Sequence, residues 1–344
     1  MRFVLILILS LSCAVAPADI PLAKKQRGMS YACAFRRDVD VRYGSPASAE
    51  SLQKLQSLGV NWISITPFGF RRAGSPKIHF GGDRMWETDD SLRGATRQAH
   101  ALGIKVMLKP HLWVRGEETI GPWKPADFAH YERFIVYYAK LATEMKVDAL
   151  CLGNELKRST HDEQAWRRLI AKVRAVYRGP LTYGANFDEV EHVGFWDALD
   201  WIGVSAYYPL VDAPTPTRAQ LVRAWKPIVR RLATLSHTWK RPIVFTEIGY
   251  RSADRAAWRQ WELPRDAPVN LAAQTAAYEA FFEAVWPQPW LAGAYPWKWF
   301  SYPNHSSAAD NEWEIENKPA AEVVRKGYLA AAGRADSAPA RQVR

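Results

Sequence analysis

Cysteine is scarce in this sequence of 344 residues, which contains three. Cys33 and Cys151 lie in apolar, strand-like runs far apart in the chain. This placement favours buried free thiols that pack as small hydrophobes over a framework of disulfides. Hydrophobic residues make up 48% and charged residues 24% of the chain. These proportions exclude a disordered chain, a collagen-like fibre and a multi-span membrane protein.

Motifs for several kinds of chemistry are also missing. The eight histidines form no His-Glu-x-x-His pattern, so we expect no metal. A glycine-rich phosphate loop is absent, so we expect no nucleotide and no other cofactor. Residues 203–207 approach a serine-hydrolase elbow but lack its closing glycine. The 46 Lys and Arg exceed the 35 Asp and Glu, but they are dispersed along the chain, so we expect no nucleic-acid partner.

The two ends of the chain differ from the rest. Residues 1–18 have a basic start at Arg2, an apolar run over 3–11 and a small-residue cleavage site at Ala16-Pro17-Ala18, as a secretory signal does. The apolar run is too short to span a bilayer. We therefore expect a secreted or periplasmic monomer without stable membrane insertion after cleavage; lipidation of Cys13 remains an alternative. We expect one domain over 19–332 and a disordered basic tail over 333–344.

What the sequence does contain is a repeated alternation of strand and helix patterns. The predicted strands cover residues 29–35, 60–68, 104–108, 149–153, 181–185, 201–208, 243–248 and 291–297. The predicted helices cover residues 49–58, 89–102, 126–145, 163–177, 190–198, 218–237, 270–285 and 320–330. Eight strands that alternate with eight helices predict an α/β protein, a single (β/α)8 TIM barrel. The links from strand to helix are long and aromatic, which places the functional site at the carboxyl ends of the strands.

Two of these strand ends carry a glutamate. The fourth strand ends in Asn154-Glu155 and the seventh in Thr246-Glu247. Two carboxyl groups over the mouth of a barrel are what glycoside hydrolysis requires, one protonated to assist the leaving oxygen and one ionised to meet the anomeric carbon. The 16 Trp, 14 Tyr and 13 Phe exceed the needs of a core, and aromatic faces stack well on sugar rings. Either glutamate taken alone fits a helix cap or an ion pair equally well.

The sequence also resembles a known family. The stretches GVNWISITPF, GIKVMLKPHLW, CLGNEL, DWIGVSAYYPL, VFTEIGY and AYPWKWF are similar to those of clan A retaining glycoside hydrolases, and most similar to family 113, whose known members are β-mannanases. Leu156 departs from the clan pattern, in which Pro often follows the glutamate. The resemblance implies a hydrolase of β-1,4-mannan or glucomannan that works through a covalent glycosyl-enzyme, and the segment 1–18 implies that it is secreted. Hydrolysis or transglycosylation of another β-glycan, and a non-catalytic carbohydrate-binding barrel, remain alternatives.

The resemblance also implies roles for single residues. Glu155 is expected to be the acid/base and Glu247 the nucleophile, while Asn154 binds the sugar 2-hydroxyl. A tyrosine, Tyr207 in preference to Tyr208, is expected to hold the nucleophile, and Trp297 or Trp299 to form the floor under the cleaved sugar. The remaining expected sugar contacts are His111, Trp113 and Trp86. For His111 a structural role is the alternative, and for the two tryptophans it is packing of their own loops.

Overall fold

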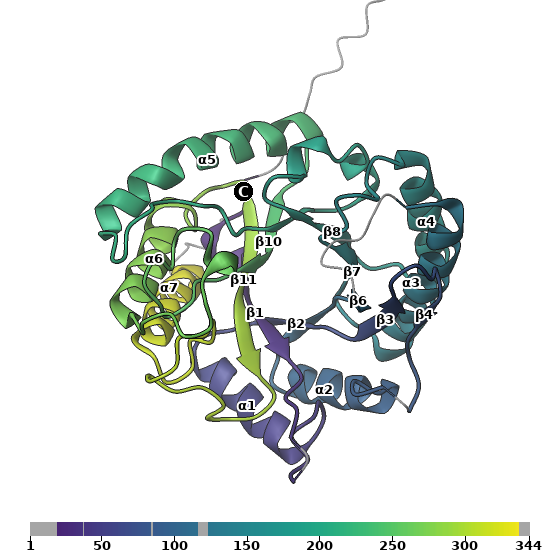
Figure 1. Cartoon of the computed structure of the whole chain (residues 1–344), viewed down its shortest axis with the longest axis horizontal. Coiled ribbons are helices and arrows are strands. Elements are labelled where there is room, and N and C mark those ends of the chain that lie inside the picture. Colours follow the sequence, from purple (N-terminus) through teal and green to yellow (C-terminus); the bar gives the residue numbers. More distant parts are fainter. Residues whose placement is uncertain (1–18, 37, 84, 116–122, 337–344) are drawn as a thin grey trace, which may run out of the picture.

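The predicted barrel is present (Figure 1). The computed structural model describes residues 19–36, 38–83, 85–115 and 123–336. Eight parallel strands close in the order β1-β11-β10-β9-β8-β7-β5-β2. Their bounds are β1 Gln26–Ala32, β2 Trp62–Ile65, β5 Lys105–Leu108, β7 Ala149–Asn154, β8 Leu181–Asn186, β9 Ile202–Ser205, β10 Ile243–Ile248 and β11 Leu291–Phe300. Strands buried on both faces read as continuous apolar runs, which is why the sequence showed them clearly.

Helices surround the barrel and cover its outer face (Figure 1). They are α1 Pro46–Ser57, α2 Asp89–Ala101, α3 Pro125–Met145, α4 Glu163–Val176, α5 Arg218–Trp239, α6 Leu271–Ala284 and α7 Pro319–Asp336. Short 3-10 turns are η1 Leu22–Lys24, η2 Val190–His192, η3 Trp196–Ala198 and η4 Gln260–Glu262. Five of the helices begin at a side chain that accepts a bond from the backbone N–H three residues later: Ser45, Thr88, Asp162, Thr217 and Asn270. These caps fix where the long loops of the mouth end.

The structure corrects three of the predicted elements. The helix predicted over 190–198 is wrong, because the two turns η2 and η3 stand there around Gly194, with Phe195 and Trp196 buried. The loops predicted after the second and third strands contain a second sheet, in the order β4-β3-β6, made of β3 Phe68–Arg72, β4 Ile78–His79 and β6 His111–Arg115. Helix α7 runs to Asp336, so it extends into the segment 333–344 for which disorder was expected.

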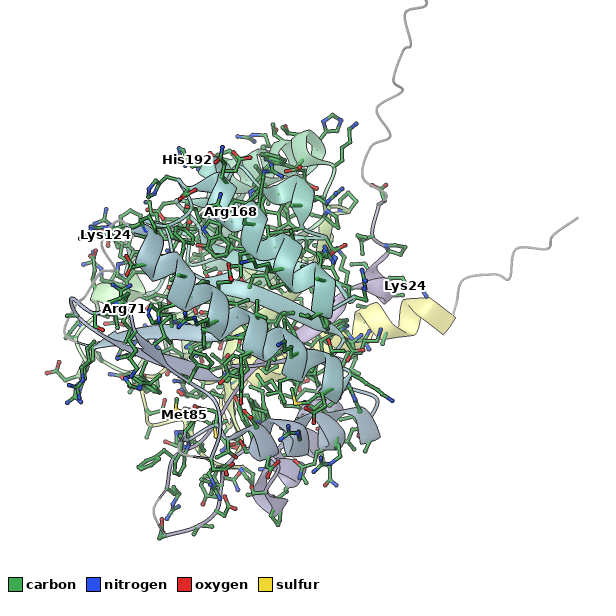
Figure 2. The ribbon with its side chains drawn as sticks, turned by 90° about the vertical axis from the view of Figure 1, so that its right-hand side faces the viewer. Lys24, Arg71, Met85, Lys124, Arg168 and His192 are labelled. Atoms are coloured by element: carbon green, nitrogen blue, oxygen red, sulfur yellow. The ribbon has the colours of Figure 1, made fainter. Side chains whose placement is uncertain are left out.

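The two ends of the barrel are well separated (Figure 2). Lys24 lies at the end where the strands begin, and Arg71 and Lys124 lie at the opposite end. Cys33 and Cys151 are free thiols; Cys151 is buried, as predicted, whereas Cys33 is partly exposed. Within the described residues, none of the helices is long and apolar enough to cross a membrane. The segment 1–18, with its predicted signal and Cys13, lies outside the described residues, as do residues 337–344 of the tail.

Candidate active site

Glu247, near the end of β10, is the most tightly held carboxylate of the barrel mouth. Its side chain is buried, and three side chains at or just after the ends of other strands donate to it. Lys109 Nζ lies 2.5 Å and Asn154 Nδ2 3.2 Å from Glu247 Oε1, while Tyr207 donates its hydroxyl to Oε2 at 2.7 Å. Burial alone would raise the pKa of Glu247. The charge and hydrogen bond of Lys109, together with Tyr207, outweigh burial and hold this pKa below its ordinary value.

Lys109 was not among the predicted site residues. It follows β5, and its side chain is fully buried. Its ammonium therefore contacts Glu247 in place of water. Its Nζ also lies 5.3 Å from the centre of the Trp297 ring, within the range of a cation–π contact. The residue sits in the segment Lys109-Pro110-His111, where the sequence drew attention to the histidine. A buried lysine is rare unless it is paired, and the sequence does not show burial, so this partner was missed.

Glu155 directly follows β7 and has the opposite electrostatic surroundings. Its backbone adopts the left-handed region, with φ 58°, and its N–H donates to the carbonyl of Gly184 at 2.8 Å. Desolvation, followed by the nearby negative charge of Glu247, raises the pKa of Glu155 to about 7. A carboxyl group with this pKa is protonated to a large extent at neutral pH. It is therefore suited to donate a proton to a leaving group.

Asn154 connects the two glutamates, because it directly precedes Glu155 in the chain and its side chain contacts Glu247. It is the last residue of β7 and is buried, and Ser205 at the end of β9 donates to its Oδ1 at 3.3 Å. That bond assigns the amide so that Nδ2 faces Glu247 and lies 3.5 Å from His111 Nδ1. Burial lowers the pKa of His111 to about 4, so its ring is neutral at neutral pH. The structure thus brings Asn154 and His111 to the carboxyl pair.

The sequence left open which residue of two aromatic pairs belongs to the site, Tyr207 or Tyr208 and Trp297 or Trp299. The positions of the side chains distinguish the members of each pair. Tyr207 contacts Glu247 and packs edge-on against Trp313, with ring centres 5.4 Å apart. Tyr208 instead packs in the core against Phe187 and Trp225. This packing favours Tyr207 over Tyr208, the order of preference predicted from the sequence. Trp313 was not predicted either, since nothing in the sequence places the last long loop against Tyr207.

Trp297 and Trp299 also differ in their burial and contacts. Trp297 is half-buried beside Lys109, at the mouth of the barrel. Trp299 is 4% exposed and donates its indole N–H to Ser51 Oγ of α1 at 2.9 Å. Strand residues two apart point to the same side of an ideal strand, but the register of β11 against β1 shifts near this point. Trp299 is therefore packed against α1, which favours Trp297 of the two residues predicted for the floor under the sugar.

The remaining two predicted tryptophans lie away from the carboxyl pair. Trp113, on β6, is 55% exposed. Trp86 packs edge-on against Phe35, donates its indole N–H to the carbonyl of Ala34 at 3.0 Å, and lies near the guanidinium of Arg42. Trp86 thus holds its loop to the segment after β1. This contact agrees with the alternative given for Trp86, that it packs its own loop. Of the two tryptophans, Trp113 is the one with an exposed ring.

A parallel (β/α)8 barrel with one carboxyl group of raised pKa and one of lowered pKa over its mouth has the arrangement that glycoside hydrolases use. The chain belongs to Glycoside Hydrolase Family 113, whose sequence model matches residues 29–318. This confirms the family, the fold and the enzyme class that the sequence indicated.

Solved structures agree with this assignment. The chain is 30% identical to a family 113 β-mannanase from Alicyclobacillus acidocaldarius, over 90% of this chain and 98% of that one, with a TM-score of 0.78. It is 25% identical to a family 113 β-1,4-mannanase, over 89% and 99% of the two chains, with a TM-score of 0.76. A β-glucuronidase of Faecalibacterium prausnitzii, 13% identical over 89% of this chain and 49% of that one, shares the fold with a TM-score of 0.62. A search of curated proteins found no match.

Proposed function

We propose that this glycoside hydrolase cleaves β-1,4-mannan or glucomannan with retention, with Glu155 as the acid/base and Glu247 as the nucleophile. The observation that carries the proposal is the division of the pair, in which the pKa of Glu155 is raised to about 7 and that of Glu247 is lowered. The substrate is inferred from the similar structures, which are β-mannanases. The same site on another β-glycan would use the same chemistry.

In the first step Glu247 attacks the anomeric carbon while Glu155 gives its proton to the departing oxygen. Lys109 and Tyr207 keep Glu247 ionised until it attacks. The covalent bond removes the negative charge of Glu247, and with it a cause of the raised pKa of Glu155. Glu155, now ionised, can therefore take a proton from the water that releases the sugar, which restores the starting state.

The neighbouring side chains have positions suited to holding the sugar. Asn154 is fixed by Ser205 and presents its amide beside Glu247, where a sugar 2-hydroxyl would meet it. Trp297 offers an aromatic face at the same place, and neutral His111 offers a ring nitrogen. Interactions with the 2-hydroxyl strengthen as the oxocarbenium-like transition state forms. We infer that these three residues bind the sugar whose bond is cut.

The first experiment is product release by residues 19–344 on linear mannan, galactomannan, glucomannan, xylan, β-glucan and chitosan. We expect short manno-oligosaccharides, a large loss of activity in Glu155→Gln and Glu247→Gln, and near wild-type activity in Glu279→Gln. Glu279 is a partly buried carboxylate on α6, outside the barrel, and is the matched control. NMR of fresh products should show the β anomer first. Appearance of the α anomer first would contradict a nucleophilic Glu247, and cleavage of another glycan would replace only the substrate.

We also propose that the chain is exported and cleaved after Ala18. The proposal rests on the basic, apolar and small-residue segments of 1–18. Expression of the full chain in a bacterium, followed by mass spectrometry of the exported product, should give a chain that begins at Asp19. A product that begins at a lipid-modified Cys13 would show a lipoprotein, and an uncleaved cytoplasmic product would contradict export.

A further inference from the structure

The second sheet carries a row of aromatic rings on one face. Strands β3 and β6 pair in parallel, with Phe68 opposite His111 and Phe70 opposite Trp113. Because side chains alternate along a strand, these four rings lie on the same face of the sheet. The side chains at the outer end of the row are well exposed, Phe70 at 41% and Trp113 at 55%. Large exposed apolar side chains that cluster in this way are typical of a binding surface.

The opposite face of this sheet is packed against the barrel helices. Leu112 is buried in the core, and a side chain on Gly69 would collide with Phe134 of α3. Arg71 and Asp127 form an ion pair across this contact at 2.8 Å, with both side chains largely buried. Figure 2 shows Arg71 beside the start of α3 at the mouth end of the molecule. The aromatic row is therefore held rigidly, and its free face is directed away from the core.

The row is continuous with the catalytic centre. His111 Nδ1 lies 3.5 Å from the amide of Asn154, which itself contacts Glu247. From His111 the rings continue to Phe68, with centres 5.4 Å apart, and from Phe68 to Phe70 and Trp113 at 6.1 and 6.4 Å. Phe68 and His111 thus form one cross-strand pair and Phe70 and Trp113 the next pair outward, with the Trp113 ring edge-on to Phe68 at 76°. A polysaccharide bound at the carboxyl pair could thus lay its next units over this row.

We propose that Phe68, Phe70 and Trp113 form a stacking platform for further sugar units of the polysaccharide whose bond lies between Glu155 and Glu247. The inference rests on the proposed function and adds to it a subsite outside the barrel, which makes the enzyme prefer long chains. Phe and Trp faces meet the C–H face of a sugar ring while the ring edge keeps its hydroxyls in water. The platform binds and takes no part in bond cleavage.

The test compares Trp113→Ala and Phe70→Ala with wild type on manno-oligosaccharides of increasing length. We expect kcat/KM on the longest oligosaccharide to fall by about tenfold in Trp113→Ala, the equivalent of ~1.4 kcal/mol, mainly through KM. Activity on the shortest cleaved substrate should stay at the wild-type level. Trp113→Phe, which keeps an aromatic face, should recover most of the loss. Leu329→Ala, which removes a 40% exposed apolar side chain from α7, is the matched control and should change neither activity.

Equal kcat/KM for Trp113→Ala and wild type at every chain length would overturn the platform, as would an equal loss on short and long substrates. Failure of the platform is distinguishable from failure of the proposed substrate. If the wild type cuts a different β-glycan, the same length series on that glycan tests the platform unchanged. If it cuts none, retardation in gels that contain each polysaccharide tests binding. Retardation that Trp113→Ala abolishes supports the platform, and absence of retardation in every gel contradicts it.

Discussion

At the scale of single residues, Glu155 and Glu247 show how position divides two identical side chains. Both stand at the carboxyl ends of parallel strands and both have lost most of their contact with water. In place of water, Glu247 accepts hydrogen bonds from the buried ammonium of Lys109 and the phenol hydroxyl of Tyr207. For Glu155, burial and the negative charge of Glu247 outweigh a hydrogen bond from Ser205 and the more weakly felt charge of Lys109, so its neutral form is favoured. Lys109 is thus the residue that makes the pair unequal.

This difference predicts the pH dependence of kcat/KM. Activity requires Glu155 with its proton and Glu247 without one. We expect the basic limb near pH 7, where Glu155 loses its proton, and an acidic limb below the ordinary carboxyl pKa of 4.5, because the pKa of Glu247 is lowered. The measurement is kcat/KM between pH 3 and 9 on a soluble oligosaccharide. A basic limb near the ordinary carboxyl pKa would show that Glu155 is not the acid.

The ion pair of Lys109 and Glu247 predicts a non-additive effect on stability. Lys109→Met leaves a carboxylate buried without its cation and should lower the free energy of unfolding at pH 7 by about 3–5 kcal/mol. Glu247→Gln in the same chain removes the uncompensated charge, so the double variant should recover much of this loss. Urea unfolding of the wild type, both single variants and the double variant measures the coupling. Additive losses would show that the two side chains do not interact.

The residues that sequence could identify are those whose type is unusual for their place. A carboxylate at the end of an apolar strand is such a residue, and both glutamates were found in this way. Lys109 could not be found, since a lysine after a strand is ordinary unless its burial is known. Tyr207 and Tyr208, like Trp297 and Trp299, could be told apart only by the direction of each side chain, which depends on local twist and register.

At the scale of elements, strand β8 shapes the site through Gly184, which lies against Asn154. A side-chain carbon on Gly184 would lie 2.5 Å from Asn154 Oδ1 and 3.0 Å from Thr246 Oγ1. Gly184→Ala should therefore displace the Asn154 amide from Glu247. We expect kcat to fall by about 10²-fold or more, since small misplacements of catalytic groups are costly. Steady-state kinetics and a thermal melt check this together. Wild-type kinetics in the variant would mean that Asn154 can shift without loss.

The strands that close the barrel could be predicted from the sequence, and the additional sheet and short turns around it could not. The eight barrel strands are mostly apolar, and short links with Gly or Pro join several of them to the preceding helix, so their pattern is strong. Strands β3 and β6 are half exposed and pair with each other across a long sequence separation. Their partners cannot be identified from one sequence. The segment 190–198 has apolar residues at helical spacing, but Gly194 interrupts it and its aromatic side chains are buried around two short turns.

At the scale of the whole molecule, barrel closure depends on the pairing of its first and last strands, β1 and β11. Lys25 immediately precedes β1 and is fully buried at the end of the barrel opposite the active site. Its Nζ donates to the carbonyls of Gln288 at 2.7 Å and Leu291 at 2.6 Å, where β11 begins. Lys25 thus connects the two ends of the sequence. Lys24, its neighbour, is exposed and offers a matched comparison.

Burial lowers the pKa of Lys25 to about 7, against 10.5 for an ordinary lysine. Between these values the unfolded chain binds a proton that the folded chain does not, so the contribution of Lys25 to stability rises with pH. Lys25→Ala should lower the free energy of unfolding by about 1–3 kcal/mol at pH 9, where a neutral amine donates to both carbonyls. The loss should be smaller at pH 6, where the folded protein must bury an ammonium.

Urea unfolding at the two pH values measures both losses. Lys24→Ala should have little effect at either pH. Neither variant should alter kcat, because the two lysines precede the start of β1, whereas Glu155 and Glu247 lie at the carboxyl ends of β7 and β10. An equal loss for Lys25→Ala at pH 6 and pH 9 would contradict the lowered pKa. It would show that the two carbonyls hold the ammonium charged as firmly as water does, and that closure of the barrel depends on a buried charge.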